Sequence, residues 1–256
     1  MKPMIVEEYD ARAMRQSQPS EYPTPKPTQA PAKAAAADWL VPAGLILLSL
    51  IPVIAGAARM FELSSGAEVT PSNARFFASP VPVVLHIISV TLYSLLGAFQ
   101  FAPGFRRRRR GWHRTAGWLL IPAGLIAALS GLWMTLFYPW PAGDGAILYG
   151  LRLVFGSAML VSIVRGVTAI RRRDIAGHGN WMIRGYAIGL GAGTQVLTHL
   201  PWELLFGKPD ESTRALLMGA GWVINLAVAE WIIRRQTARP IRAAANAVAY
   251  GRSNLS

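Results

Sequence analysis

The stretch of sequence that decides the fold is residues 171–206, RRRDIAGHGNWMIRGYAIGLGAGTQVLTHLPWELLF. It begins with three arginines and continues as an apolar run of the length that crosses a bilayer as one helix. Small residues recur on one face of that helix, and a polar stripe follows near its far end. The pattern predicts a multi-pass membrane protein and does not assign a reaction or a transport step.

The composition places the chain in the same class. Of its 256 residues, 52% are hydrophobic and 15% are charged, whereas a soluble domain carries about 25% charged residues. The chain has no Cys, which excludes disulfides, thiolate metal sites, covalent c-type haem and cysteine nucleophiles. We attribute the net charge of +13 to basic loops on one side of a membrane, and we expect no nucleic-acid partner.

Six apolar runs follow a Pro- and Ala-rich segment, residues 1–37, which we expect to be a disordered cytoplasmic tail. Each run has about the 20 residues that span a bilayer, and none shows the short alternating segments of a β-barrel. The predicted fold is all-α, a six-transmembrane-helix bundle over residues 38–236, with a cytoplasmic C-terminal tail at residues 237–256. The predicted helices cover residues 39–58, 81–103, 115–138, 147–170, 181–205 and 214–233.

The distribution of Lys and Arg predicts the orientation, because basic residues concentrate in cytoplasmic loops. With six crossings, 21 of the 26 basic residues fall on the side of the N-terminus. We therefore expect both termini in the cytoplasm. The five-arginine run at residues 106–110 is a topology signal and a candidate contact for anionic lipid head groups. The basic residues of the opposite side are Arg59, Arg75, Arg152, Lys208 and Arg214.

Two of the predicted helices carry glycine on a single face, which allows helices to approach closely in lipid. We expect these two helices to be central. The first predicted helix has no ionisable residue between Asp38 and Arg59 and is expected at the periphery. The glycines are Gly185, Gly189 and Gly193 in the fifth predicted helix and Gly117, Gly124 and Gly131 in the third.

The four histidines lie in two pairs by depth. His86 and His199 fall inside the spans at similar depth, and His113 and His178 fall at the interface on the side of the termini. Two facing imidazoles in a helix bundle are the ligands of b-type haem. His86 and His199 are therefore candidate haem b ligands, and His113 and His178 are weaker ones. The alternative is that the buried histidines bond neighbouring helices and the interfacial ones lie beside lipid head groups.

Two polar stripes accompany the buried histidines. Polar side chains at membrane depth are costly, and they mark a functional interior or a water-filled cavity. The stripes favour either a proton relay, since the pKa of His is close to neutrality, or a hydrogen-bonded packing core; both readings stay open. The stripes are Gln195, His199 and Glu203 on the fifth predicted helix, and His86, Tyr93 and Gln100 on the second.

Two ion pairs are expected near the membrane surfaces. Arg152 is predicted to pair with Glu203 or with Asp144, which lie on the same side of the membrane. Glu230 stands four residues before Arg234 in the sixth predicted helix, a spacing that brings the two side chains together.

An anion site is predicted at the start of the fifth helix. Free backbone N–H groups there favour anions, and His178 and Arg184 are placed to bind a phosphate or carboxylate, with a lipid head group as the expected ligand. The GLGAG run at residues 189–193 lacks the strand–turn–helix context of a dinucleotide site. No metal site and no catalytic residue is assigned, and we expect the chain not to be an enzyme.

Three segments together resemble a known family. They are HIISVTLYSLLGAFQF (86–101), WHRTAGW (112–118) and GHGNWMIRGYA (177–187), and they resemble the predicted bacterial membrane proteins grouped as domain of unknown function 2306. The resemblance covers about residues 80 to 235. It implies a bundle of short-looped helices in a bacterial cytoplasmic (inner) membrane, and it implies no activity.

Three functions remain from the sequence. The first is a non-catalytic membrane subunit or small-molecule carrier. The second is a b-type haem-binding membrane redox protein ligated by His86 and His199, and the third is a proton-linked transporter that uses the polar stripes. The expected partners are the lipid bilayer, anionic lipid head groups, and another membrane protein or a second copy of the chain.

Overall fold

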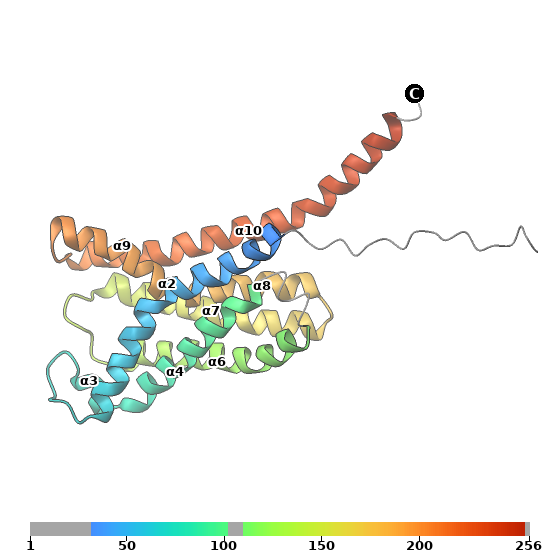
Figure 1. Cartoon of the computed structure of the whole chain (residues 1–256). Coiled ribbons are helices and arrows are strands. Elements are labelled where there is room, and N and C mark those ends of the chain that lie inside the picture. Colours follow the sequence, from blue (N-terminus) through green and yellow to red (C-terminus); the bar gives the residue numbers. More distant parts are fainter. Residues whose placement is uncertain (1–31, 102–109, 254–256) are drawn as a thin grey trace, which may run out of the picture. The chain divides into compact units, whose positions relative to one another are not determined.

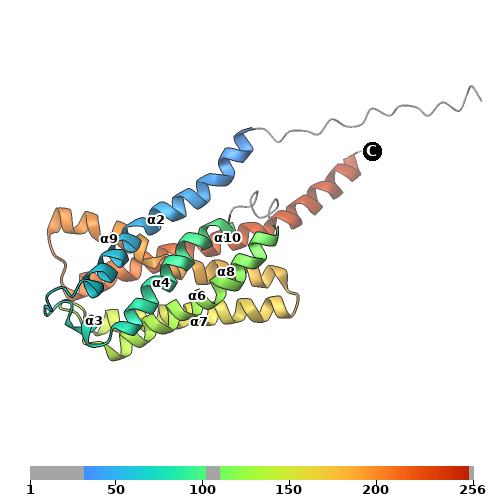
Figure 2. The same cartoon turned by 60° about the horizontal axis from the view of Figure 1, so that its bottom comes forward.

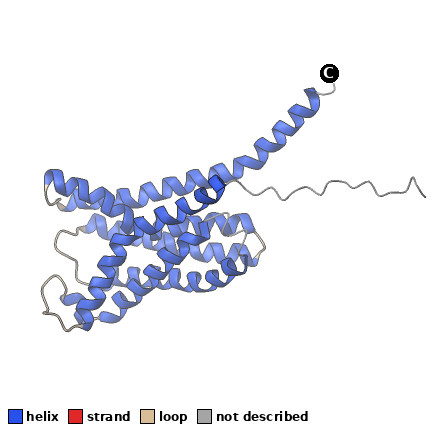
Figure 3. Cartoon of the chain, in the orientation of Figure 1, coloured by secondary structure: helices blue, strands red, loops and turns tan. Residues whose placement is uncertain are grey.

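The computed structural model describes residues 32–101 and 110–253 (Figure 1). Every secondary-structure element in those residues is a helix (Figure 3), which confirms the all-α class. The chain divides into two units, residues 1–35 and 36–256, and the contacts below all lie in the second. Residues 1–31 of the predicted N-terminal tail and most of the five-arginine run fall outside the described residues, whereas residues 32–37 of that tail are helical.

The helices follow one another with short connections. Five of them are long and apolar enough to cross a membrane: α2, α4 with η1, α6, α7 and the first part of α10. They correspond to five of the six predicted spans. The elements are α2 (Ala32–Ser64), α3 (Ala74–Ala78), α4 (Pro80–Ala98), the 3₁₀ helix η1 (Phe99–Phe101), α6 (Arg110–Phe137), α7 (Ala146–Arg171), α8 (Ile175–Gly189), α9 (Gly191–Phe206) and α10 (Glu211–Ser253).

The fifth predicted helix differs from expectation, because it is divided at Leu190 into α8 and α9. Each half is too short to span a membrane alone, so the structure has five candidate spans where six were predicted. Trp222 of α10 contacts the chain at the break: a Cβ on Gly191 would lie 2.3 Å from its Nε1. Asn225 of α10 donates to Ala187 O (3.0 Å), a carbonyl in the last turn of α8, where helical partners run out.

The core lies where α4, α6, α7 and α8 run beside one another (Figure 2). Tyr93 of α4 is buried there, because glycines on two neighbouring helices leave room for its ring. A Cβ on Gly124 would lie 2.7 Å from Tyr93 Cε2, and one on Gly189 would lie 3.1 Å from its Cε1. This confirms that the glycine faces of α6 and α8 allow close packing, here against the Tyr93 ring. Gly117 on α6 faces open space instead.

Lipid-facing surface surrounds this core. Only 11% of the apolar stretch of α2 is buried, the smallest share among the five candidate spans, which confirms its expected peripheral place. Trp118 on α6 is 82% exposed and Leu47 on α2 is 70% exposed. Apolar surface of this extent on long helices suits lipid and not water, so the chain is a membrane protein in contact with lipid.

Candidate small-molecule cavity

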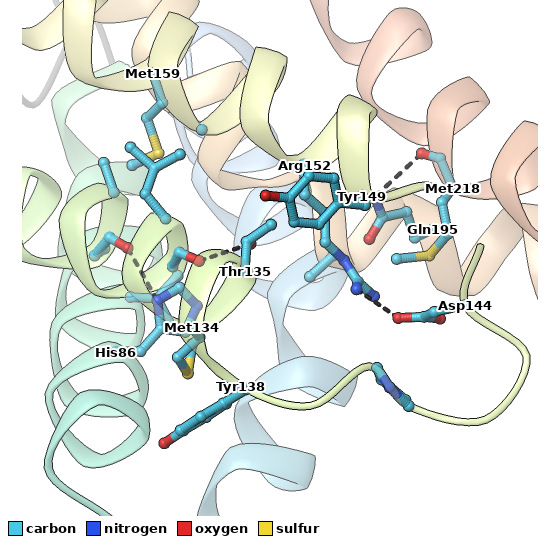
Figure 4. A pocket seen from close by; sticks show the side chains of 18 of the residues that line it. His86, Met134, Thr135, Tyr138, Asp144, Tyr149, Arg152, Met159, Gln195 and Met218 are labelled. Carbon is cyan, nitrogen blue, oxygen red and sulfur yellow. Dashed lines mark hydrogen bonds and ion pairs between the residues drawn. The ribbon is translucent and has the colours of Figure 1, made fainter. Parts of the chain in front are cut away.

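A cavity of about 380 Å³ is lined by residues of α3, α4 and α6 to α10, beneath the loop at residues 138–145. Figure 4 looks into it, with His86, Met134 and Tyr138 on one side and Asp144, Gln195 and Met218 on the other. Its lining changes with depth, from charged and aromatic residues at the loop to apolar residues further along the helices.

A buried carboxylate organises the outer end. Asp144 is 7% exposed and accepts hydrogen bonds from Arg152 Nη1 (2.5 Å) and Arg214 Nε (2.8 Å). Its backbone N–H donates to Pro141 O (3.1 Å), which closes a turn. Gly143 within that turn has φ +84°, a conformation that favours glycine. Of the two partners predicted for Arg152, the structure selects Asp144.

Arg75 of α3 lines the same end of the cavity. Its guanidinium lies over the Phe76 ring, 4.5 Å from the centroid, and Arg59 of α2 lies over that ring at the same distance. Burial, followed by the charge of Arg59, lowers the pKa of Arg75. The charge of Asp144 acts on Arg75 in the opposite direction, but none of the ion pairs among the described residues includes Arg75.

His86 lines the cavity from α4. Its Nδ1 lies 2.9 Å from Ala127 O and 3.2 Å from Ser130 Oγ on α6. Because a carbonyl oxygen only accepts hydrogen bonds, Nδ1 carries the proton, and the Nε2 of the neutral ring keeps a lone pair. His86 thus offers the cavity a hydrogen-bond acceptor.

The inner part of the cavity is apolar. Met159 of α7 and Trp222 of α10 line it, and Trp222 stacks on Phe155 with the ring centroids 4.8 Å apart. Methionine side chains adapt to ligands of irregular shape. Gln195 of α9 is the polar exception, and its Nε2 donates to Met218 O (3.1 Å).

The cavity unites only two of the residues predicted as a polar interior, His86 and Gln195. Tyr93 instead packs in the core, with its ring 5.6 Å from that of Tyr186. Gln100 lies in η1, and its amide nitrogen and oxygen are both buried without a hydrogen-bond partner. The stripe of α4 is therefore not continuous along one cavity.

His199 does not line the cavity. Its Nδ1 bonds Gln195 O (2.8 Å), one turn back on α9, and its Nε2 is buried without a hydrogen-bond partner. Glu203 is exposed. His86 and His199 both lie in the described part of the chain, and no hydrogen bond joins their rings. The two candidate haem ligands thus have different partners: His86 bonds a carbonyl of α6, and His199 bonds a carbonyl of its own helix, α9.

The residues predicted for an anion site at the opposite end have protein partners. His178 Nδ1 lies 2.9 Å from Gly166 O of α7. Arg184 makes a bidentate pair with Glu230, with Nε 2.5 Å from Oε1 and Nη2 3.0 Å from Oε2. The prediction that Glu230 pairs with Arg234 is therefore wrong. Glu230 on α10 faces α8 and pairs with Arg184 instead.

His113 lies in the first turn of α6, half-buried. Within the described ranges, no group of three or more His, Cys, Asp or Glu residues is placed to hold a metal ion.

Sequence reasoning missed most of the cavity lining, including Arg75, Tyr138, Met159 and Trp222. A signal for its outer end exists in the loop YPWPAGDGA, residues 138–146, where a single acidic residue stands between two glycines. Such a residue in an apolar chain is costly unless it is paired.

The comparisons with known proteins define the family. No curated protein and no solved structure matches the chain significantly. A family model described as "Predicted membrane protein (DUF2306)" matches residues 83–233, which is more than half of the chain and includes α6 to α9 and most of the cavity lining. The chain therefore belongs to the DUF2306 family of predicted membrane proteins.

Proposed function

We propose that this chain is a non-catalytic membrane protein that binds and carries a small molecule in the cavity beneath residues 138–145. The observation that supports the proposal is the cavity itself. Its volume of about 380 Å³ falls in the range of small-molecule sites, roughly 300–1,000 Å³. A mostly apolar lining with a few placed polar groups is also typical of such sites.

We further propose that α8 and α9 together form a sixth, discontinuous crossing. Helix from Ile175 to Phe206, interrupted only at Leu190, extends about 48 Å at 1.5 Å per residue. With six crossings, the basic residues concentrate on one side, which favours cytoplasmic termini in a bacterial inner membrane. Discontinuous helices commonly border the binding sites of membrane carriers, and Gly189 and Ala192 beside the break line the cavity.

The test is to fill the cavity and look for loss of a bound molecule. Ala192→Phe adds a ring where the α9 backbone borders the cavity. Leu197→Phe is the matched control, because Leu197 lies on the same helix, is 60% exposed and does not line the cavity. Native mass spectrometry and solvent extraction of the purified protein should find a small molecule in the wild type and in Leu197→Phe, and much less in Ala192→Phe. Equal amounts in all three proteins would contradict the proposal.

Haem b is the second candidate ligand, because one observation favours it. The Nδ1 bond of His86 to Ala127 O is the kind of bond that orients a metal-ligating histidine and leaves Nε2 for the metal. His199 does not line the cavity as the second ligand. An absorption spectrum before and after dithionite reduction tests whether the protein binds haem. Haem bands that are lost in His86→Ala would support haem binding. A colourless protein whose spectrum does not change when haem is added would exclude it.

A proton-linked transporter is the weaker alternative. It requires a path to the His199–Glu203 stripe, and the cavity reaches that stripe only at Gln195.

A further inference from the structure

The charge at the outer end of the cavity is unbalanced. Asp144, Arg152, Arg214 and Arg75 meet there, and the carboxylate of Asp144 is shared by the guanidiniums of Arg152 and Arg214. Arg75 has no hydrogen bond to a carboxylate within the part of the chain that the structure describes. Three guanidiniums therefore surround one carboxylate.

The other nearby acids do not correct this imbalance. Glu62 forms an ion pair with Arg59 and accepts a hydrogen bond from Asn73. Glu211 approaches Gly145, but it is exposed and forms no ion pair with Arg75. An anion that entered here would therefore meet the guanidinium of Arg75, which has no ion-pair partner among the described residues.

Below the charged end, the cavity has the character of a site for a hydrocarbon chain. Met159 lies 13 positions after the start of α7 at Ala146, about 20 Å along that helix. Met159 and Trp222 give this part an apolar lining. A ligand that fits both parts needs a charged end and an apolar body.

We infer that the cavity binds an amphiphile with an anionic head group, a carboxylate or a phosphate, whose head is bound by Arg75 and Arg152. The tail lies against Met159 and Trp222. The planar guanidinium presents two parallel N–H donors, and it binds both carboxylates and phosphates through paired hydrogen bonds. This inference rests on the proposed function and adds the chemical class of the ligand.

The experiment measures binding to the full-length chain in nanodiscs of a zwitterionic lipid, with empty nanodiscs subtracted. The probes are dodecanoate, dodecyl phosphate and the uncharged dodecanol, which share one tail. Arg75→Gln removes the uncompensated cation. Lys208→Gln is the matched control, because Lys208 is an exposed cation in the connection between α9 and α10 and does not line the cavity. The unfolding temperature of each variant verifies that it is folded.

Wild-type protein is expected to bind one or both anions more tightly than dodecanol, and the tighter anion identifies the head group as carboxylate or phosphate. Arg75→Gln should weaken anion binding by about 10- to 100-fold, the effect of a lost charged hydrogen bond, and leave dodecanol binding unchanged. Lys208→Gln should change anion binding less than about 3-fold.

Two results would contradict the inference, and only one of them would also contradict the proposed function. If all three probes bind equally, lose affinity in Ala192→Phe and are insensitive to Arg75→Gln, the cavity binds amphiphiles and the anionic head group is overturned. If Ala192→Phe leaves every probe unaffected, the cavity is not the site, and the proposed function fails together with the inference.

Discussion

The two ends of the helix bundle use arginine in opposite ways. At the loop at residues 138–145, Arg152 and Arg214 converge on Asp144, whose side chain is 3% exposed. At the other end, Arg165 and Arg172 line an exposed groove on α7 and α8. The guanidinium of Arg165 lies 5.3 Å from the Trp181 ring centroid.

The two ends differ in whether a buried carboxylate joins the arginines, and not in the arginines themselves. A buried carboxylate needs its partners, because desolvation without compensation is expensive. Exposed arginines keep their hydration, and their pairing contributes little. The interactions of Asp144 should therefore contribute to the stability and the ligand selectivity of the protein, whereas the exposed arginines at the other end should bind their surroundings weakly. Four predictions test this contrast.

The largest effect is expected from Asp144→Asn. Removing the charge leaves Arg152 and Arg214 without their shared partner, which should lower the free energy of unfolding by about 3 kcal/mol. Thermal unfolding in detergent, followed by tryptophan fluorescence, measures the change. Glu203→Gln is the control, since Glu203 is exposed. Equal unfolding temperatures for the two variants would remove the contrast between the ends.

The Arg184–Glu230 pair should matter less. Its side chains are 26% and 38% exposed, so Arg184→Gln is expected to cost about 1 kcal/mol of unfolding free energy. Glu230→Gln should add little once Arg184 is replaced, because a double-mutant cycle isolates the shared interaction. Strictly additive losses would show that the two side chains act independently.

A smaller effect is expected for lipid binding at the exposed groove. Arg172→Gln should weaken association with anionic lipid by less than about 1 kcal/mol and leave association with zwitterionic lipid unchanged. Native mass spectrometry with mixed-lipid micelles counts the lipids retained. The control is Arg59→Gln at the opposite end. Similar retention by wild type and both variants would argue against a head-group role for this groove.

The smallest effect concerns Asp210, just before α10. Its carboxylate accepts a hydrogen bond from the Thr213 backbone N–H (2.6 Å), and this bond lowers the pKa of Asp210. A lowered folded-state pKa means that the contribution to stability is present above the unfolded-state value, about 3.9, and is lost as the pH falls through the folded-state value.

The corresponding measurement compares Asp210→Ala with wild type. The unfolding temperature of the variant should be slightly lower at pH 6, and the gap should narrow as the pH falls toward 3. Asp210→Asn, which keeps a capping oxygen without a titrating group, should stay close to wild type at pH 6. A gap that is constant with pH would show that the charge of Asp210 does not contribute.

The sequence predicted the helices well because length and hydropathy determine them locally. Five predicted runs reappear as candidate spans with shifted ends. The division of the fifth run was missed, since apolar character continues through Leu190. The break depends on tertiary contacts: Trp222 against Gly191 and Asn225 on Ala187. The cluster of Gly189, Gly191 and Gly193 was a visible hint, because glycine weakens helices.

The candidate site was predicted only in part. His86 and Gln195 stood out because polar groups are rare in apolar helices. Arg75 did not, since an arginine near the membrane surface is ordinary in sequence. Arg75 matters to the site because it lacks a carboxylate partner. That lack follows from the packing of α3 against the loop at residues 138–145 and not from any local sequence pattern. Glu230 shows the same limit, because its partner Arg184 is remote in sequence.

The break at Leu190 has a consequence for how the chain enters the membrane. α9 has only 16 residues, and it carries Thr194, Gln195 and Thr198. These three side chains bond α10 at Asn225 Oδ1, Met218 O and Leu217 O. A segment so short and polar inserts poorly alone, but a hairpin that already contains these bonds presents few unsatisfied groups to lipid. With α8 and α9 as the proposed sixth crossing, synthesis of α10 should therefore precede stable insertion of α9, and ribosomes stalled before Asn225 should leave α9 accessible to aqueous labelling.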